Sequence, residues 1–287
     1  MKNKVKIHPI ILNVLKQKER YFMHNYLEII AYWQQQNIDS IPKLEQALDN
    51  FNILFAYNSG VIENPSITYH DTREIFENGK INNYTGNLRT LYEIANQKDC
   101  ASYLLPKIIK KEPLTEELLK KIHKLLTKGT YDETRYNING ERPGEYKKHD
   151  YVTGRNEVGA DVLSVAREIK DLLEEVASIK TNDAETIIKI AAYTHNVLES
   201  IHAFADGNGR LGRTIVNYIL LTNNLPPIII YDEDKKYYYA CLEKFDEEED
   251  LSAMIEFFKY EMEKTWRKTL DLKEGKSKKT PKISDCN

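Results

Sequence analysis

His202-Ala-Phe-Ala-Asp-Gly-Asn-Gly-Arg-Leu-Gly-Arg213 is the segment that decides the fold of this chain. It holds three of the twelve glycines and lies between one predicted helix and the start of the next. A Gly-Asn-Gly turn can point successive backbone N–H groups at one place and so form an anion-binding nest. The positive end of the following helix strengthens such a nest. Arg210 and Arg213 share one face of that helix. The segment therefore predicts a binding site for a chain of phosphates.

Two further residues of the segment suit chemistry on a phosphate. Asp206 places a carboxylate beside the nest, and magnesium prefers one or two carboxylates together with phosphate oxygens. His202 lies four residues earlier, and the ordinary histidine pKa of about 6.5 suits a general base. Each feature alone is more often structural, but their combination within twelve residues predicts a phosphate-transfer site.

The rest of the chain predicts a mainly α-helical fold, because glycine and proline are scarce and apolar residues recur at helical spacing. Pro113 is expected in the first turn of its helix. The segment 139–154 contains three glycines and a proline, which predicts a short β-hairpin or flap. The expected helices are 12–36, 41–57, 71–77, 84–95, 114–126, 158–179, 184–201, 210–223, 232–245 and 251–270.

The composition excludes several classes of protein. The 287 residues carry a net charge of −3, with 30% charged and 41% hydrophobic residues, as in ordinary soluble proteins. This balance argues against a general nucleic-acid binder, and no apolar run approaches the roughly 18 residues of a membrane span. Cys100, Cys241 and Cys286 are too far apart for a thiolate zinc site. We expect a cytoplasmic protein with no nucleic-acid or membrane partner.

The sequence resembles the Fic-domain family. Residues 202–213 match the family motif HxFx(D/E)GNGRxxR at every defined position, and the similarity extends over about 59–258. Most members with the full motif transfer AMP from ATP to a Ser, Thr or Tyr hydroxyl of a target protein and release pyrophosphate. The resemblance implies a Fic-type helical domain with a β-hairpin flap, preceded by a helical N-terminal extension.

The resemblance also implies a role for each residue of the motif. His202 would deprotonate the target hydroxyl, and Asp206 would bind Mg²⁺, with Mn²⁺ as the alternative. Arg213 would bind the γ-phosphate. The other residues expected to hold the nucleotide are Gly207, Asn208, Gly209, Arg210 and Gly212.

The adenine pocket and the flap are placed by the same resemblance. The adenine would lie against a downstream helix, with Tyr239 and Leu242 one turn apart. Related proteins often carry Asn at position 246, where this chain has Asp, so the base preference stays open. The pocket residues are Tyr238, Tyr239, Leu242 and Asp246. The flap residues expected to align the target are Val152, Thr153 and Gly154.

The segment Ser59-Gly-Val-Ile-Glu-Asn64 matches a second family pattern, (S/T)xxxE(G/N). Ser59 and Glu63 are four residues apart and share a helix face. The resemblance implies that Ser59, Glu63 and Asn64 belong to an inhibitory helix, in which Glu63 pairs with Arg213 and keeps it from the γ-phosphate. In some relatives this glutamate also supports removal of AMP, and the sequence leaves that role open.

Three regions are expected: a helical N-terminal region over 1–110, a catalytic core over 111–270 and a flexible polar tail over 271–287. The favoured function is an autoinhibited protein adenylyltransferase acting on ATP and a protein substrate. Two alternatives stay open: a Fic-type transferase of UMP, phosphoryl or phosphocholine groups, and a non-catalytic regulatory helical protein. A homodimer is also left open.

Overall fold

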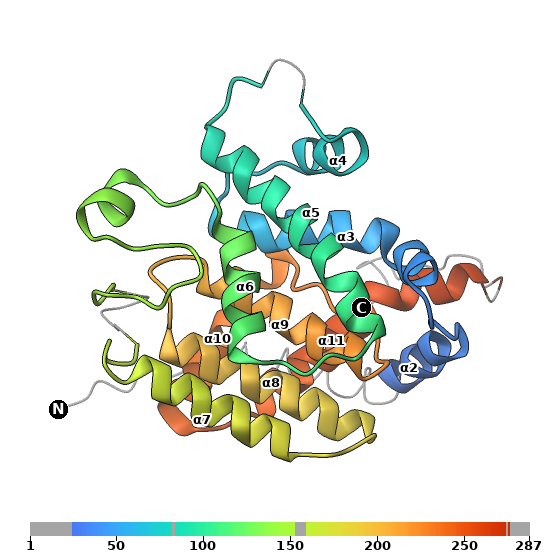
Figure 1. The fold of residues 1–287 in the computed structure, drawn as a ribbon. Coiled ribbons are helices and arrows are strands. Elements are labelled where there is room, and N and C mark those ends of the chain that lie inside the picture. Colours follow the sequence, from blue (N-terminus) through green and yellow to red (C-terminus); the bar gives the residue numbers. More distant parts are fainter. Residues whose placement is uncertain (1–24, 82–83, 153–158, 274, 276–287) are drawn as a thin grey trace, which may run out of the picture.

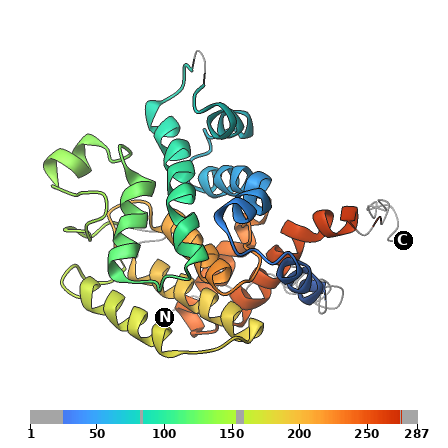
Figure 2. The same cartoon turned by 45° about the vertical axis from the view of Figure 1, so that its right-hand side comes forward.

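The computed structural model describes residues 25–81, 84–152, 159–273 and 275, and these form a helical protein, as predicted (Figures 1 and 2). Two short helices lie in the connections: a π-helix, η1 (Thr134–Ile138), and a 3-10 helix, η2 (Asp232–Asp234). The α-helices are α2 (Asn25–Gln35), α3 (Ile41–Glu63), α4 (Tyr69–Asn78), α5 (Leu88–Ile109), α6 (Glu116–Thr127), α7 (Val165–Ser178), α8 (Ala184–Ile201), α9 (Asn208–Thr222), α10 (Lys235–Glu248) and α11 (Ser252–Lys273).

Helix α9 lies at the centre and contacts α3, α5, α6 and α8 (Figure 1). Every residue from Leu211 to Leu220 is buried, so this helix has no solvent face over these three turns. Gly212 lets α8 approach closely, because a Cβ there would lie 2.7 Å from Glu199 Oε1. The central position of α9 places the turn that precedes it among several helices at once.

Helices α3 and α5 are longer than the sequence predicted. Helix α3 continues beyond the expected end at 57 because Ser59, Gly60 and Ile62 are buried, with Ser59 1% exposed. Gly60 packs so closely that a Cβ would lie 2.7 Å from the side chain of Ile67. Helix α5 begins after Asn87, whose side chain accepts the Arg89 N–H at 2.8 Å. Tertiary burial thus carries α3 on toward the motif turn, whereas α5 starts later than expected and runs on to Ile109.

Other boundaries differ by two to seven residues. Pro113 lies before its helix, because Thr115 caps α6 by accepting the Leu118 N–H at 3.2 Å. Helix α7 begins at Val165 and not near 158. Helix α11 continues to Lys273, into the expected tail. The first half of the expected helix 12–36 lies outside the described residues.

The structure does not confirm the β-hairpin. The described residues contain no β-strand, and 139–152 form turns, while 153–158 lie outside the described part of the chain. Buried Glu141 organises this loop, since its carboxylate accepts the Lys148 N–H at 2.9 Å and the Tyr151 hydroxyl at 3.0 Å. A carboxylate that collects donors from its own loop favours a wrapped turn over paired strands.

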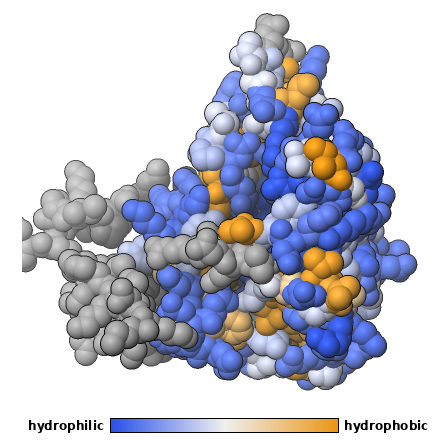
Figure 3. Space-filling view, turned by 90° about the vertical axis from the view of Figure 1, so that its left-hand side faces the viewer, coloured by the Kyte–Doolittle hydropathy of each residue, from blue (hydrophilic) through white to orange (hydrophobic). Residues whose placement is uncertain are grey.

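Hydrophobic residues on the side of the molecule seen in Figure 3 form separate small patches in a largely hydrophilic surface. Leu163 and Val152 are among the exposed apolar side chains, at 93% and 69%. Within the described residues, no helix is both long and apolar enough to cross a bilayer.

Candidate active site

The motif turn is held by its own side chains. The Asn208 amide accepts the Phe204 N–H at 3.0 Å and donates to the Phe204 carbonyl at 2.7 Å, which closes the loop. Phe204 is fully buried and stacks on the His123 ring, with centroids 3.7 Å apart. Gly207 adopts φ 84°, a left-handed conformation that favours glycine, immediately before α9. The turn therefore presents the N-terminus of α9 in a defined orientation.

His202 ends α8 in a left-handed conformation with φ 48°. Burial lowers its pKa to about 4, and the nearby Lys147 ammonium contributes in the same direction. The Lys147 N–H donates to the Ala203 carbonyl at 2.9 Å, which ties the loop 139–152 to the motif. At neutral pH the imidazole is therefore unprotonated, the form that a general base requires.

The ion pair expected between Arg213 and Glu63 is present. Arg213 Nη2 lies 2.8 Å from Glu63 Oε1, although the two residues are 150 positions apart. Arg213 also donates to the Ser59 hydroxyl at 3.0 Å and to the Ser59 carbonyl at 2.9 Å. Burial alone would raise the pKa of Glu63, but the Arg213 guanidinium outweighs it and lowers that pKa. The carboxylate is thus charged and bound to the arginine at neutral pH.

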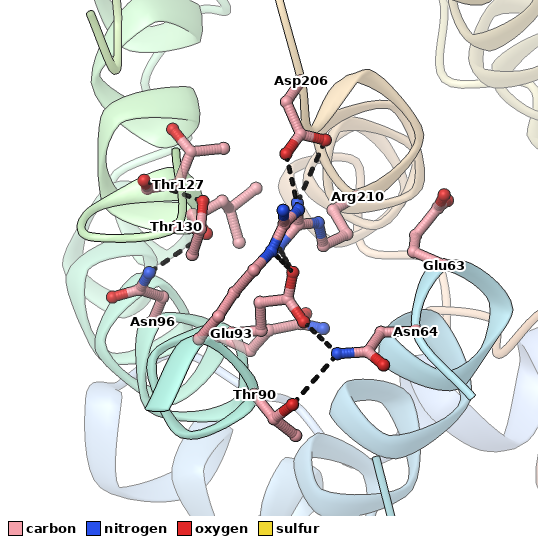
Figure 4. A network of polar contacts seen from close by, with 12 residues as sticks. Glu63, Asn64, Thr90, Glu93, Asn96, Thr127, Thr130, Asp206 and Arg210 are labelled. Carbon is pink, nitrogen blue, oxygen red and sulfur yellow. Dashed lines mark hydrogen bonds and ion pairs between the residues drawn. The ribbon is translucent and has the colours of Figure 1, made fainter. Parts of the chain in front are cut away.

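Helix α5 contributes two residues that the sequence analysis missed. Asp206 Oδ2 accepts from Arg89 Nη2 at 2.8 Å, and Asp206 Oδ1 lies 3.6 Å from Arg210 Nη2. Arg89 Nε also bonds to Glu93 Oε1 at 3.0 Å. Figure 4 shows Glu93 between Arg210 and Asn64, which donates to Glu93 Oε2 at 2.7 Å. The i, i+4 spacing of Arg89 and Glu93 signals a helix pair, but nothing in the sequence links them to Asp206.

The donor set around Asp206 fits a cation that arrives with a nucleotide. Asp206 is partly exposed and offers one carboxylate, and the described residues contain no group of three His, Cys, Asp or Glu side chains able to hold a metal. Magnesium commonly takes one or two protein carboxylates and completes its shell with phosphate oxygens and water. Asp206 could therefore supply one such carboxylate.

His123 on α6 connects the motif turn to the loop that follows α6. Its Nδ1 accepts the Gly144 N–H at 2.9 Å, so its Nε2 carries the proton and donates to the Asp206 carbonyl at 2.8 Å. Burial lowers the pKa of His123 to about 4, which keeps the ring neutral. A single histidine on a helix gives no sequence signal for this role.

The expected adenine-pocket residues lie on α10 in different environments. Tyr238 is 1% exposed and its hydroxyl lies 2.9 Å from His195 Nε2, so it packs inward. Tyr239 is 43% exposed, and Leu242 follows it one turn later, half-buried. Asp246 Oδ1 already accepts the Ser200 hydroxyl at 2.6 Å.

The expected flap is described only in part. Val152 is exposed, as a docking residue would be, while Thr153 and Gly154 lie outside the described residues.

Two glycines of the motif differ in their surroundings. A Cβ at Gly212, which is expected near the nucleotide, would point at α8, whereas a Cβ at Gly209 would point at the Glu63 carboxylate. Gly212 therefore lies at the contact between α8 and α9, whereas Gly209 lies beside Glu63.

Comparison with known proteins now identifies the domain. The sequence model of the Fic/DOC family matches residues 113–220, which include α6, α8 and nearly all of α9. Residues 113–220 form a Fic domain. Its fold is shared with a Fic domain-containing signaling protein of Bacteroides thetaiotaomicron, with a TM-score of 0.73 and 22% identity over 88% of this chain and 98% of that one. Fic-1 of Caenorhabditis elegans superimposes with a TM-score of 0.69 and 18% identity over 93% of this chain and 76% of that one.

Curated relatives of the Fic domain carry names that state an activity. A probable protein adenylyltransferase of Aquifex aeolicus is 32% identical over 117 residues, which cover 40% of this chain and 32% of that protein. Protein adenylyltransferase Fic of Drosophila persimilis is 27% identical over 196 residues, or 66% of this chain and 35% of that protein. The chain thus matches only about a third of the length of these relatives.

Proposed function

We propose that this chain is an autoinhibited protein adenylyltransferase that transfers AMP from ATP to a Ser, Thr or Tyr hydroxyl of a target protein. The observation that carries the proposal is the contact between Glu63 Oε1 and Arg213 Nη2 at 2.8 Å. This contact joins Glu63 of the (S/T)xxxE(G/N) pattern to Arg213 of the Fic motif, the arginine expected to bind the γ-phosphate. The names of the curated relatives support the same activity.

Each residue of the motif has its own role in the proposed reaction. Neutral His202 accepts the proton of the target hydroxyl, whose oxygen bonds to the α-phosphorus as the bond to pyrophosphate breaks. The backbone N–H groups at the start of α9 and Arg210 orient the phosphates, and Arg213 binds the γ-phosphate. Asp206 would hold a magnesium ion, which would supply positive charge to the phosphate oxygens. Catalysis of this kind rests on positioning and charge stabilisation.

In this proposal, Glu63 inhibits the reaction because its carboxylate competes with the γ-phosphate of ATP for the Arg213 guanidinium. Arg213 is 2% exposed, so an incoming phosphate reaches it only by replacing Glu63. Ser59 makes two hydrogen bonds to Arg213 and keeps it in place whether or not Glu63 is bound. A charge-assisted contact is strong enough to compete with a phosphate. Movement of the last turn of α3 would therefore switch the site on.

The test is AMP transfer from α-labelled ATP with magnesium and a cell lysate, read on a gel and by intact mass. Wild type, Glu63→Gly and Glu63→Gly/His202→Ala are compared. Glu77→Gly is the matched control, because Glu77 also lies near a helix end and pairs with an arginine, Arg73, at 2.7 Å. We expect label with Glu63→Gly alone, and little with the other three.

Other results would redirect the proposal. Label from γ-labelled ATP or from another nucleotide would indicate a Fic-type transferase of a different group. Equal labelling by wild type and Glu63→Gly at saturating ATP and magnesium would contradict autoinhibition. Label that survives His202→Ala would contradict His202 as the base.

A further inference from the structure

The carboxylate expected to hold the cation is already bound to an arginine from another helix. Arg89 Nη2 lies 2.8 Å from Asp206 Oδ2, and Arg89 belongs to α5, 117 residues earlier in the chain. The two side chains are 38% and 22% exposed, so the pair lies at a surface that solutes can reach. A guanidinium at this distance occupies one of the two oxygens that a divalent cation would use.

Arg89 has a second carboxylate within reach. Its Nε bonds to Glu93 Oε1 at 3.0 Å, on the same face of α5. Glu93 is 3% exposed, and its Oε1 also lies 3.5 Å from Arg210 Nη1. Arg89 can therefore leave Asp206 and still keep an ionic partner.

The end of the inhibitory helix contacts the same glutamate. Asn64, which follows Glu63 and caps α3, donates its amide to Glu93 Oε2 at 2.7 Å and to Thr90 Oγ1 at 3.2 Å. Figure 4 shows Asn64 turned toward Glu93, while Glu63 points the other way. A continuous set of polar contacts thus runs from the last turn of α3 to Asp206.

We propose that Arg89 is a positioning residue that holds the Asp206 carboxylate in the free protein and yields it to the divalent cation of a bound nucleotide, and that Asn64 sets how firmly Arg89 holds it. This inference rests on the proposed function only in assigning the cation to a nucleotide. It gives the last position of the (S/T)xxxE(G/N) pattern a physical role beside that of Glu63.

The role of Asn64 follows from the two oxygens of Glu93. With α3 in place, Asn64 occupies Oε2, and Arg89 and Arg210 share Oε1. When the end of α3 moves away, Oε2 becomes free, and Glu93 can take both ends of the Arg89 fork. Arg89 is then drawn away from Asp206. Displacement of one helix end thus opens the γ-phosphate arginine and the cation carboxylate together.

The test measures Mn²⁺ binding by electron paramagnetic resonance in the presence of ADP, which lacks the γ-phosphate and so does not need Arg213. Wild type, Arg89→Gln, Arg89→Lys, Asn64→Ala and Asn64→Ala/Arg89→Gln are compared as full chains. Arg73→Gln is the matched control, because Arg73 forms an i, i+4 pair with Glu77 on an exposed helix face. Asp206→Asn gives the background level of Mn²⁺ binding in a protein that lacks the Asp206 carboxylate.

We expect Arg89→Gln to bind Mn²⁺ about fivefold more tightly than wild type, because a partly exposed charge-assisted pair no longer competes. Arg89→Lys keeps the positive charge but loses the two-pronged guanidinium, so its affinity for Mn²⁺ lies between those of wild type and Arg89→Gln. Asn64→Ala tightens binding by about twofold, and the double variant equals Arg89→Gln, since Asn64 acts through Arg89. Arg73→Gln matches wild type.

Unchanged or weaker Mn²⁺ binding by Arg89→Gln would overturn the proposal. So would equal binding by wild type and Asp206→Asn, because the cation would then lie elsewhere. Additive effects of Asn64→Ala and Arg89→Gln would overturn the link through Glu93. None of these measurements requires AMP transfer. A protein that shows the expected shifts but transfers no AMP would therefore keep this inference and lose the proposed function.

Discussion

Replacing Glu63 with glycine should strengthen the binding of ATP far more than the binding of ADP. Under the proposed function, the γ-phosphate of ATP reaches Arg213 only by displacing the Glu63 carboxylate, which lies 2.8 Å from Arg213 Nη2. ADP carries no γ-phosphate and leaves that ion pair intact. The ratio of the two dissociation constants therefore measures the competition directly.

The size of the effect follows from the exposure of the pair. A hydrogen bond to a charged group contributes about 1.5–3 kcal/mol, whereas a solvent-exposed ion pair contributes about 0.2–1 kcal/mol. Arg213 is 2% exposed but Glu63 is 37% exposed, so solvent screens one side and a value of about 1.4 kcal/mol is reasonable. This corresponds to about a tenfold rise in the preference for ATP over ADP. Glu63→Gln keeps an acceptor without the charge, and we expect about threefold.

Calorimetric titration of each nucleotide with constant magnesium, at neutral pH and about 0.15 M salt, measures these constants. Glu77→Gly is again the control for a glycine near a helix end, and its ratio should equal that of wild type. Equal tightening of ATP and ADP by Glu63→Gly would refute the reasoning, because Glu63 would then obstruct the whole pocket. An unchanged ratio would show that Arg213 does not bind the γ-phosphate.

Three further predictions concern the residues that build the site. Because burial lowers the pKa of His202 to about 4, the rate of AMP transfer by the released enzyme should stay near its plateau down to about pH 5, and a midpoint near 6.5 would contradict a neutral buried base. His123→Ala should lower the free energy of unfolding in urea by about 3 kcal/mol, through a cavity and the lost bond to the Asp206 carbonyl, and an effect below about 1 kcal/mol would contradict that bond. Gly212→Ala should lower stability by about 1–3 kcal/mol in the same assay, because its Cβ would lie 2.7 Å from Glu199 Oε1, and a neutral effect would show that α8 and α9 can separate.

The local geometry of the motif could be predicted from sequence because it depends on neighbouring residues. The N-terminal nest of α9, the position of His202 at the end of α8 and the shared face of Arg210 and Arg213 all follow from spacing within twelve residues. The pairing of Glu63 with Arg213 came from the family resemblance, since its two partners are 150 residues apart.

Helix lengths were less predictable because burial decides them. Local pattern ended α3 near 57, but the close packing of Gly60 against Ile67 carries the helix on to Glu63. The expected hairpin is absent from 139–152, where the Glu141 carboxylate accepts the Lys148 N–H, a backbone donor that a strand pair could have used, and also the Tyr151 hydroxyl. In both cases a specific packing or side-chain contact outweighed the preference read from the local pattern.

The sequence by itself determined the helical class, the glycine turn before α9, the position of His202 at the end of α8 and the arginine pair, because these depend on residue type and spacing within one turn and one helix. Only the tertiary structure decided that Arg89 of α5 reaches Asp206, that Glu93 of α5 lies beside Arg210, and that His123 of α6 holds the motif turn. Those contacts join residues 117 and 83 positions apart. Such pairs form only when α9 packs between α3, α5, α6 and α8, so no local pattern could contain them.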